Sequence, residues 1–190
     1  MPCCRKLEAF VFALALTFAA GAAHAGDIVA NGAQLVAGNE GYSLSADFTV
    51  RLNERLTEAV NKGVVLYFTV DFELTRSRWY WFDQTVARRA RTFQLSYHAL
   101  TRQYRLSSGA LHQGFPSLED ALRMLSHPRH WLVVEKEEIA GELDYVARTR
   151  LRLDPSLMAK TFQVSALSTR DWHQSSDWLV WNFSDPGGAR

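Results

Sequence analysis

Alternation of apolar and polar side chains is the dominant pattern of this chain. Its clearest example is segment 42–52, where apolar residues occupy every second position and Ser, Asp, Thr and Arg fill the positions between them. Successive side chains of a β-strand point to opposite faces, so this pattern predicts a strand with one buried and one wet face. The other segments for which we predict strands are 28–37, 66–74, 93–97, 104–106, 131–136, 143–153 and 178–183. Strands of this kind are typical of antiparallel sheets.

Two short helices are expected between the strands. Asn53 can cap the first helix, which buries an apolar stripe and ends at Gly63. Ser117 to Asp120 resembles a capping box at the start of the second helix, and His127-Pro128 ends it. The apolar stripes consist of Leu56, Ala59 and Val60 in the first helix, and of Leu118, Ala121, Leu122 and Leu125 in the second.

About eight strands with two short helices predict a mainly β fold, an antiparallel two-sheet sandwich. An immunoglobulin-like arrangement is one form of this prediction, and a closed barrel is the alternative. The segment 38–41 is expected to form a hairpin turn between the first two strands. No repeat or linker divides residues 26–184, which we interpret as a single domain, followed by a flexible C-terminal tail at 185–190.

The first 25 residues have the three parts of a secretory signal. Arg5 and Lys6 precede an apolar stretch of 15 residues from Ala9 to Ala23, and Ala23-His24-Ala25 has the small residues that signal peptidase requires. We therefore predict cleavage after Ala25 and a periplasmic location. The alternative is an uncleaved anchor, but the apolar stretch is shorter than the roughly 18 residues of a spanning helix.

The charge and cysteine content of the remaining chain exclude several classes of protein. Removing the first 25 residues leaves equal numbers of basic and acidic residues, so the electrostatic signature of nucleic-acid binding is absent. Cys3 and Cys4 both precede the apolar stretch, which argues against a lipoprotein and leaves no cysteine for a disulfide. No twin-arginine pair precedes the apolar stretch, so we expect export in the unfolded state and no complex cofactor.

Six segments of the chain resemble a known family. They are 41–48, 66–74, 79–82, 151–154, 160–164 and 176–178. Over nearly all of residues 28–184 the chain resembles an exported bacterial family catalogued as domain of unknown function 4390, found chiefly in β-proteobacteria. The resemblance implies an exported domain with no assigned catalytic residues. Because genes of this family often lie near a membrane sensor kinase, it also implies a link to envelope sensing.

Candidate catalytic and metal-binding residues are few. Asp171, His173 and Ser175 or Ser176 are close in sequence, but such residues in a polar loop more often form turns than a triad. Five histidines are scattered after residue 25, and Pro128 separates His127 from His130, so we expect no metal site. Asp71 and Glu73 share one face of a strand, where we expect them to pair with arginines of neighbouring strands instead of hydrolysing glycosides.

Two surface features are candidate binding sites. The first is Trp79-Tyr80-Trp81-Phe82, in which one aromatic pair is core or covered and the other is a candidate exposed platform. The remaining tryptophans, Trp131, Trp172, Trp178 and Trp181, are expected to pack at the rim of the sandwich.

The second feature is charge. Seven arginines lie between Arg76 and Arg105 against one acid, and five acids lie between Glu135 and Asp144 against one lysine. We favour the interpretation that these two segments are neighbours and cancel, and a basic patch for an anionic partner is the alternative. A second basic ladder is formed by Arg148, Arg150 and Arg152.

These observations predict a non-catalytic interaction or accessory module of the envelope. The predicted binding residues are Trp79, Trp81, Arg88, Arg89 and Arg91. Their partner would be an envelope protein or an anionic surface, and no membrane-spanning segment is expected after cleavage. A carbohydrate-binding module that uses Trp79 and Trp81 is the second hypothesis, and a periplasmic hydrolase is the third.

Overall fold

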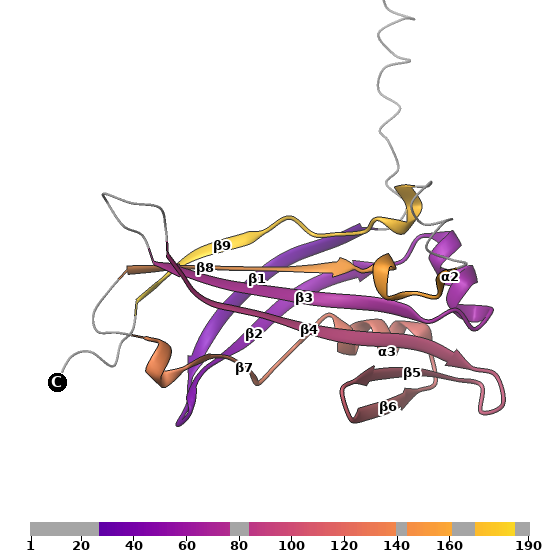
Figure 1. Cartoon of the computed structure of the whole chain (residues 1–190). Helices are drawn as coiled ribbons and strands as arrows, with labels where there is room; N and C mark the ends of the chain where they lie inside the picture. Colours follow the sequence, from indigo (N-terminus) through magenta and orange to yellow (C-terminus); the bar gives the residue numbers. More distant parts are fainter. Residues whose placement is uncertain (1–26, 77–83, 140–143, 161–169, 185–190) are drawn as a thin grey trace, which may run out of the picture.

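Two antiparallel sheets form the protein in the computed structural model, which describes residues 27–76, 84–139, 144–160 and 170–184. The small sheet has the order β1-β2-β7, and the large sheet has the order β6-β5-β4-β3-β8-β9. The strands are β1 (Asp27–Ala37), β2 (Gly41–Arg51), β3 (Leu66–Arg76), β4 (Gln84–His98), β5 (Gln103–Ser108), β6 (Leu111–Phe115), β7 (Trp131–Glu135), β8 (Asp144–Leu153) and β9 (Leu179–Ser184). In Figure 1, β1 and β2 pass obliquely behind the long strands of the large sheet.

The predicted mainly β, two-sheet antiparallel fold is confirmed. In the described part of the chain the large sheet is a meander from β3 to β6 that β8 and β9 extend on the other side, which differs from the strand order of an immunoglobulin domain. Among the described strands, two features were not predicted, namely strand β6 and the first nine residues of β4. The predicted signal segment and the predicted C-terminal tail lie outside the described residues.

The core lies between the facing sides of the two sheets. The alternate residues of β3 from Leu66 to Leu74 are fully buried, and so are Leu44 and Ala46 of β2. All buried apolar residues of the described ranges belong to one cluster. Because the core takes alternate side chains, the polar ones lie on the opposite face of the strand. On β3 that opposite face carries Thr69, Asp71 and Glu73.

Both predicted helices are present with their predicted caps. Helix α2 (Glu54–Asn61) begins where the Asn53 side chain accepts a hydrogen bond from the Leu56 backbone N–H at 2.9 Å. Helix α3 (Leu118–Leu125) begins where the Ser117 hydroxyl accepts one from the Asp120 backbone N–H at 3.1 Å. None of the helices in the described ranges is long and apolar enough to cross a bilayer.

The small sheet covers only part of the large one. Strand β1 contacts β8 and β9, and β7 contacts β4, whereas α3 contacts β5 and β6 (Figure 1). The chain after α3 is held against β2, because the Phe48 N–H donates to the Ser126 carbonyl at 2.9 Å and the Ala46 N–H to the Pro128 carbonyl at 3.1 Å. Helix α3 therefore serves as the second layer over the β5–β6 hairpin. Single turns of 3-10 helix follow at η1 (Lys136–Glu138), η2 (Pro155–Leu157) and η3 (Arg170–Trp172).

Candidate functional site

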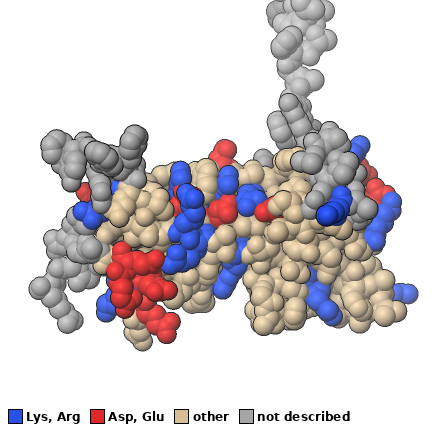
Figure 2. All heavy atoms as spheres, in the orientation of Figure 1, with Lys and Arg blue, Asp and Glu red and all other residues tan. Residues whose placement is uncertain are grey.

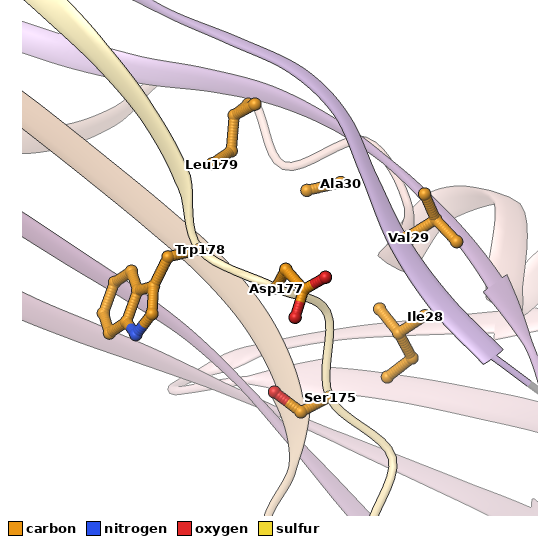
Figure 3. A pocket seen from close by; sticks show the side chains of 7 residues that line it. All are labelled: Ile28, Val29, Ala30, Ser175, Asp177, Trp178 and Leu179. Carbon is orange, nitrogen blue, oxygen red and sulfur yellow. The ribbon is translucent and has the colours of Figure 1, made fainter.

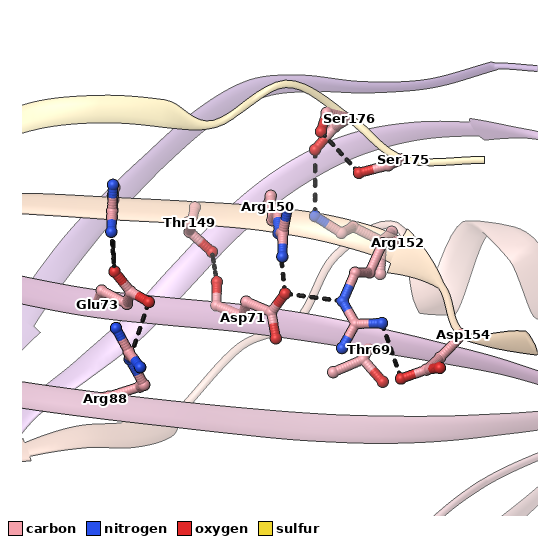
Figure 4. Close-up of polar contacts among 12 residues, drawn as sticks. Thr69, Asp71, Glu73, Arg88, Thr149, Arg150, Arg152, Asp154, Ser175 and Ser176 are labelled. Atoms are coloured by element: carbon pink, nitrogen blue, oxygen red, sulfur yellow. Dashed lines mark hydrogen bonds and ion pairs between the residues drawn. The ribbon is translucent and has the colours of Figure 1, made fainter. Parts of the chain in front are cut away.

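The outer face of the large sheet carries an ordered set of opposite charges. Strand β3 lies between β4 and β8, so each of its outward residues has a neighbour on either side. Glu73 lies opposite Arg88 on β4 and Arg148 on β8, and Asp71 lies opposite Arg150 on β8. Directly opposed side chains of paired strands are close enough to interact. Figure 4 shows the resulting chain of contacts along β3 and β8.

Each carboxylate of β3 is held by two arginines. Glu73 accepts from Arg148 Nε at 2.7 Å and lies 2.9 Å from Arg88 Nε, and only 11% of its side chain is exposed. Asp71 Oδ2 lies 2.9 Å from the Nε atoms of both Arg150 and Arg152. The predicted pairing of Asp71 and Glu73 with arginines across the strands is therefore confirmed.

The row of ion pairs on β3 and β8 ends at Asp154, just after β8. Arg152 Nη1 lies 2.7 Å from Asp154 Oδ2, and the Ser156 N–H donates to the same carboxylate at 3.2 Å. Burial opposes ionisation of Asp154, but the hydrogen bonds from Ser156 and Arg152 outweigh it and hold the pKa of Asp154 below its ordinary value. Burial likewise disfavours the charged form of Arg152, yet Asp71 and Asp154 raise the pKa of Arg152. The two charges stabilise each other.

Trp178 completes this face. The guanidinium groups of Arg148 and Arg150 lie 4.8 and 4.4 Å from its ring centre, which is the geometry of cation–π stacking. Trp131 and Trp172 are buried as predicted, and Trp181 packs against the core. Trp178 instead lies on the outer face of the sheet, where the sequence predicted a packing residue. Alternation along β9 contained the signal, because Leu179, Trp181 and Phe183 share the core side and leave positions 178 and 180 outside.

The predicted basic residues of β4 lie on two different faces. Arg88 lies on the outer face with Glu73. Arg89 and Arg91 lie opposite Phe72 and Val70, on the side of the sheet that faces the core. Arg89 binds Glu138 at 2.8 Å, and Arg91 stacks over Trp131 at 5.4 Å. The three arginines therefore do not form one binding surface.

The acidic segment lies beside the arginines of β4. Figure 2 shows acidic side chains gathered over the end of β7 and η1, next to basic side chains of the large sheet. The Arg89–Glu138 pair joins the two segments directly. The favoured interpretation, that the basic and acidic segments are neighbours, is thus confirmed for this pair.

The other predicted candidates have different outcomes. Trp79 and Trp81, on which the carbohydrate hypothesis depends, lie outside the described residues. Asp171 pairs with Arg55 at 3.2 Å, Ser175 donates to the Ser176 carbonyl at 2.9 Å, and the Ser176 hydroxyl accepts from the Leu151 N–H at 3.1 Å. These contacts tie Asp171 to α2, and Ser175 and Ser176 to the backbone of neighbouring residues. Within the described ranges no three metal-ligating side chains gather at one point.

A small cleft of about 300 Å³ opens between β1 and segment 175–179. Figure 3 shows Asp177 directed toward this cleft, which Ser175 also lines, and Trp178 on the other side of the segment. The remaining lining is apolar, from Ile28 to Ala30 and Leu179. Among the described residues, no histidine lines the cleft.

The fold and this face define a two-sheet antiparallel β domain with an outer face of paired arginines and carboxylates. The chain belongs to the family described as domain of unknown function (DUF4390), whose model matches residues 25–182. The resemblance in the sequence is thereby confirmed at the level of the family. No curated protein and no solved structure is significantly similar to the chain.

Proposed function

We infer that this protein is an exported, non-catalytic domain of the cell envelope that binds a protein partner through the outer face of its large sheet. The observation that carries this proposal is the stacking of Arg148 and Arg150 on Trp178. Val180 lies beside them on the same face and is 56% exposed. Arginine and tryptophan are the side chains most enriched at the centres of protein interfaces.

The chemistry of this face suits a partner with acidic groups. Four arginines, Arg88, Arg148, Arg150 and Arg152, share three carboxylates, so the set keeps one positive charge. A guanidinium has five N–H donors, and a contact to a single carboxylate oxygen uses only one or two of them. The side chain of Arg88 is 69% exposed, which leaves donors for a second acceptor. An acidic segment of an envelope protein would supply such acceptors.

The face is also rigid before binding. Its arginines are held by ion pairs on neighbouring strands, and Trp178 is held by stacking. Side chains that are already ordered lose less entropy on association, which favours their use in recognition.

Export is a separate part of the proposal and has its own test. The apolar stretch from Ala9 to Ala23 and the Ala23-His24-Ala25 sequence support a cleaved signal. N-terminal sequencing of the protein from a periplasmic fraction is expected to begin at Gly26. A first residue of Met1 in a cytosolic fraction would exclude export.

A crosslinking pull-down from native envelopes tests the binding surface. Proteins captured by the wild-type chain are expected to be lost with Val180→Glu and with Trp178→Ala, because the first adds a like charge for an acidic partner and the second removes the stacked ring. Val36→Glu is the matched control, since Val36 is an exposed valine (46%) on β1 of the other sheet. Capture that is the same for Val180→Glu and Val36→Glu would contradict the proposal. If vesicles containing phosphatidylglycerol bind with the same dependence on Val180, the partner is a lipid surface and the proposed protein partner is wrong.

A further inference from the structure

A second pocket lies on the opposite side of the large sheet, between the β4–β6 strands and the end of α3. It encloses about 420 Å³, within the range of pockets that hold small ligands (roughly 300–1,000 Å³). Its wall surface is mainly apolar and is supplied by Phe93, Leu106, Leu111, Met124 and Pro128, and polar residues complete the lining, namely Arg91, Ser107, Ser108, Gln113, His127, Arg129 and His130. Leu111 is 71% exposed and Met124 is also exposed, so apolar surface is open to solvent at this place. Exposed apolar side chains gathered around a pocket indicate a binding site more strongly than the same residues scattered singly.

Arg91 brings a positive charge into this apolar wall. It lies on the core-facing side of β4, opposite the fully buried Val70. The other arginines near the pocket have acidic partners, since Arg89 binds Glu138 and Arg129 binds Asp47. Across the described ranges, by contrast, no carboxylate lies within ion-pair distance of Arg91, and its contact is the stacking on Trp131. A partly buried cation of this kind is costly unless an anion joins it.

The two histidines of the pocket, His127 and His130, supply no negative charge to balance Arg91. His127 Nδ1 is hydrogen-bonded to the Arg123 carbonyl at 2.7 Å, and its Nε2 lies 3.6 Å from Asp47. His130 is exposed at the rim. Arg91 is partly buried, and burial lowers the pKa of its guanidinium. Even so lowered, an arginine remains charged at neutral pH.

We propose that this pocket binds an amphipathic anion, a single acyl chain with a terminal carboxylate, and that Arg91 holds the carboxylate. The apolar walls from Phe93 to Met124 would take the chain, and the planar guanidinium matches a carboxylate with two parallel hydrogen bonds. The site lies on the other face of the sheet from Trp178, so it is independent of the proposed partner surface.

Calorimetric titration of the purified protein, expressed from the full chain, tests this site with three probes. Laurate carries both features, dodecanol carries the chain without the charge, and acetate carries the charge without the chain. We expect laurate to bind at least about tenfold more tightly than either of the others, a difference of about 1.4 kcal/mol. Failure of laurate to bind, or equal affinity for laurate and dodecanol, would overturn the proposal.

Variants assign the interaction to its residues. Arg91→Met keeps an apolar side chain against Trp131. It is expected to lower the affinity for laurate by at least about tenfold and to leave the affinity for dodecanol unchanged. Arg88→Met is the matched control on the outer face of the same strand and is expected to leave laurate binding within about twofold. Met124→Glu, at an exposed position of the pocket wall, tests the site without changing the partly buried Arg91 and is expected to lower the affinity for laurate as well. The proposed site is wrong if Arg91→Met folds and binds laurate as tightly as the wild type, or if Met124→Glu does not change the affinity for laurate.

Discussion

Arg89 of the large sheet binds Glu138 of the segment that follows the small sheet, at 2.8 Å. The same Glu138 side chain accepts from the Glu135 N–H at 2.9 Å, which closes the first turn of η1. A single carboxylate therefore links the end of β7 to β4. This contact explains how two oppositely charged segments that lie far apart in the sequence become neighbours.

We expect the charge reversal Arg89→Glu to lower the free energy of unfolding by about 1–2 kcal/mol, because it places two carboxylates together at a partly buried position. Urea denaturation followed by circular dichroism measures the loss. Arg102→Glu is the control, since Arg102 is an exposed turn residue with no ion pair to the described acids, and its effect should stay within about 0.5 kcal/mol. Equal stability of the two variants would mean that the link to Glu138 does not hold the sheets together.

Gly41 is required at the start of β2. Its φ of +147° is one that other residues rarely adopt, and an added Cβ would lie 2.1 Å from the Val134 carbonyl oxygen on β7. We expect Gly41→Ala to destabilise the protein by at least about 2 kcal/mol, because backbone atoms cannot move away cheaply. Gly38→Ala, in the same turn, adds a Cβ that meets its nearest atom at an ordinary 3.5 Å. Thermal denaturation should therefore separate the two variants clearly, and a Gly41→Ala variant as stable as Gly38→Ala would show that β7 does not approach β2 so closely.

Most strands could be predicted because one of their faces is in contact with water. The alternation in 42–52 and 66–74 is regular, and both segments are strands at almost the predicted boundaries. The pairing of Asp71 and Glu73 with arginines followed from the same alternation, since arginines occupy the alternate positions 148, 150 and 152 of β8. Local pattern was sufficient for these features.

The first half of β4 could not be predicted for a physical reason. Arg89 and Arg91 occupy positions that face the core, where the pattern requires apolar residues, so the alternation is interrupted there. Their environments depend on Glu138 and Trp131, which are 49 and 40 positions away in the chain. Sites at which sequence patterns fail are often functional ones, and Arg91 is the residue to which the second pocket assigns a ligand.

A buried amide offers a stabilising substitution. Gln174 is 7% exposed, and neither polar atom of its side chain has a hydrogen-bond partner in the described structure. A buried polar group without a partner costs about 1–3 kcal/mol. We therefore expect Gln174→Met to raise the melting temperature by about 2–4 °C per kcal/mol recovered. Its backbone carbonyl, which accepts from the Leu153 N–H at 2.8 Å, is unaffected.

The exposed Gln34 on β1 is the control for this prediction, because its side chain is already in water and Gln34→Met should leave the melting temperature unchanged. A lower melting temperature for Gln174→Met would show that the amide is hydrogen-bonded in solution. Scanning calorimetry of both variants decides between these outcomes.

The ion pair of Asp154 predicts a specific dependence of stability on pH. Its pKa is lower in the folded protein than its ordinary value of 3.8, so the folded state favours the ionised form. The stabilisation is then fully present above about pH 4–5 and is lost as the pH falls through the lowered pKa. Asp154→Asn keeps an oxygen acceptor for the Ser156 N–H but removes the charge that faces Arg152.

We expect Asp154→Asn to be less stable than the wild type by about 1 kcal/mol at pH 7. The two proteins should converge as the pH falls through the lowered pKa of Asp154, because protonation then removes the same charge from the wild type. Urea denaturation at a series of pH values measures the difference directly. A constant difference over the whole pH range would mean that the substitution acts through packing, and that the charge pair between Asp154 and Arg152 contributes nothing to the end of β8.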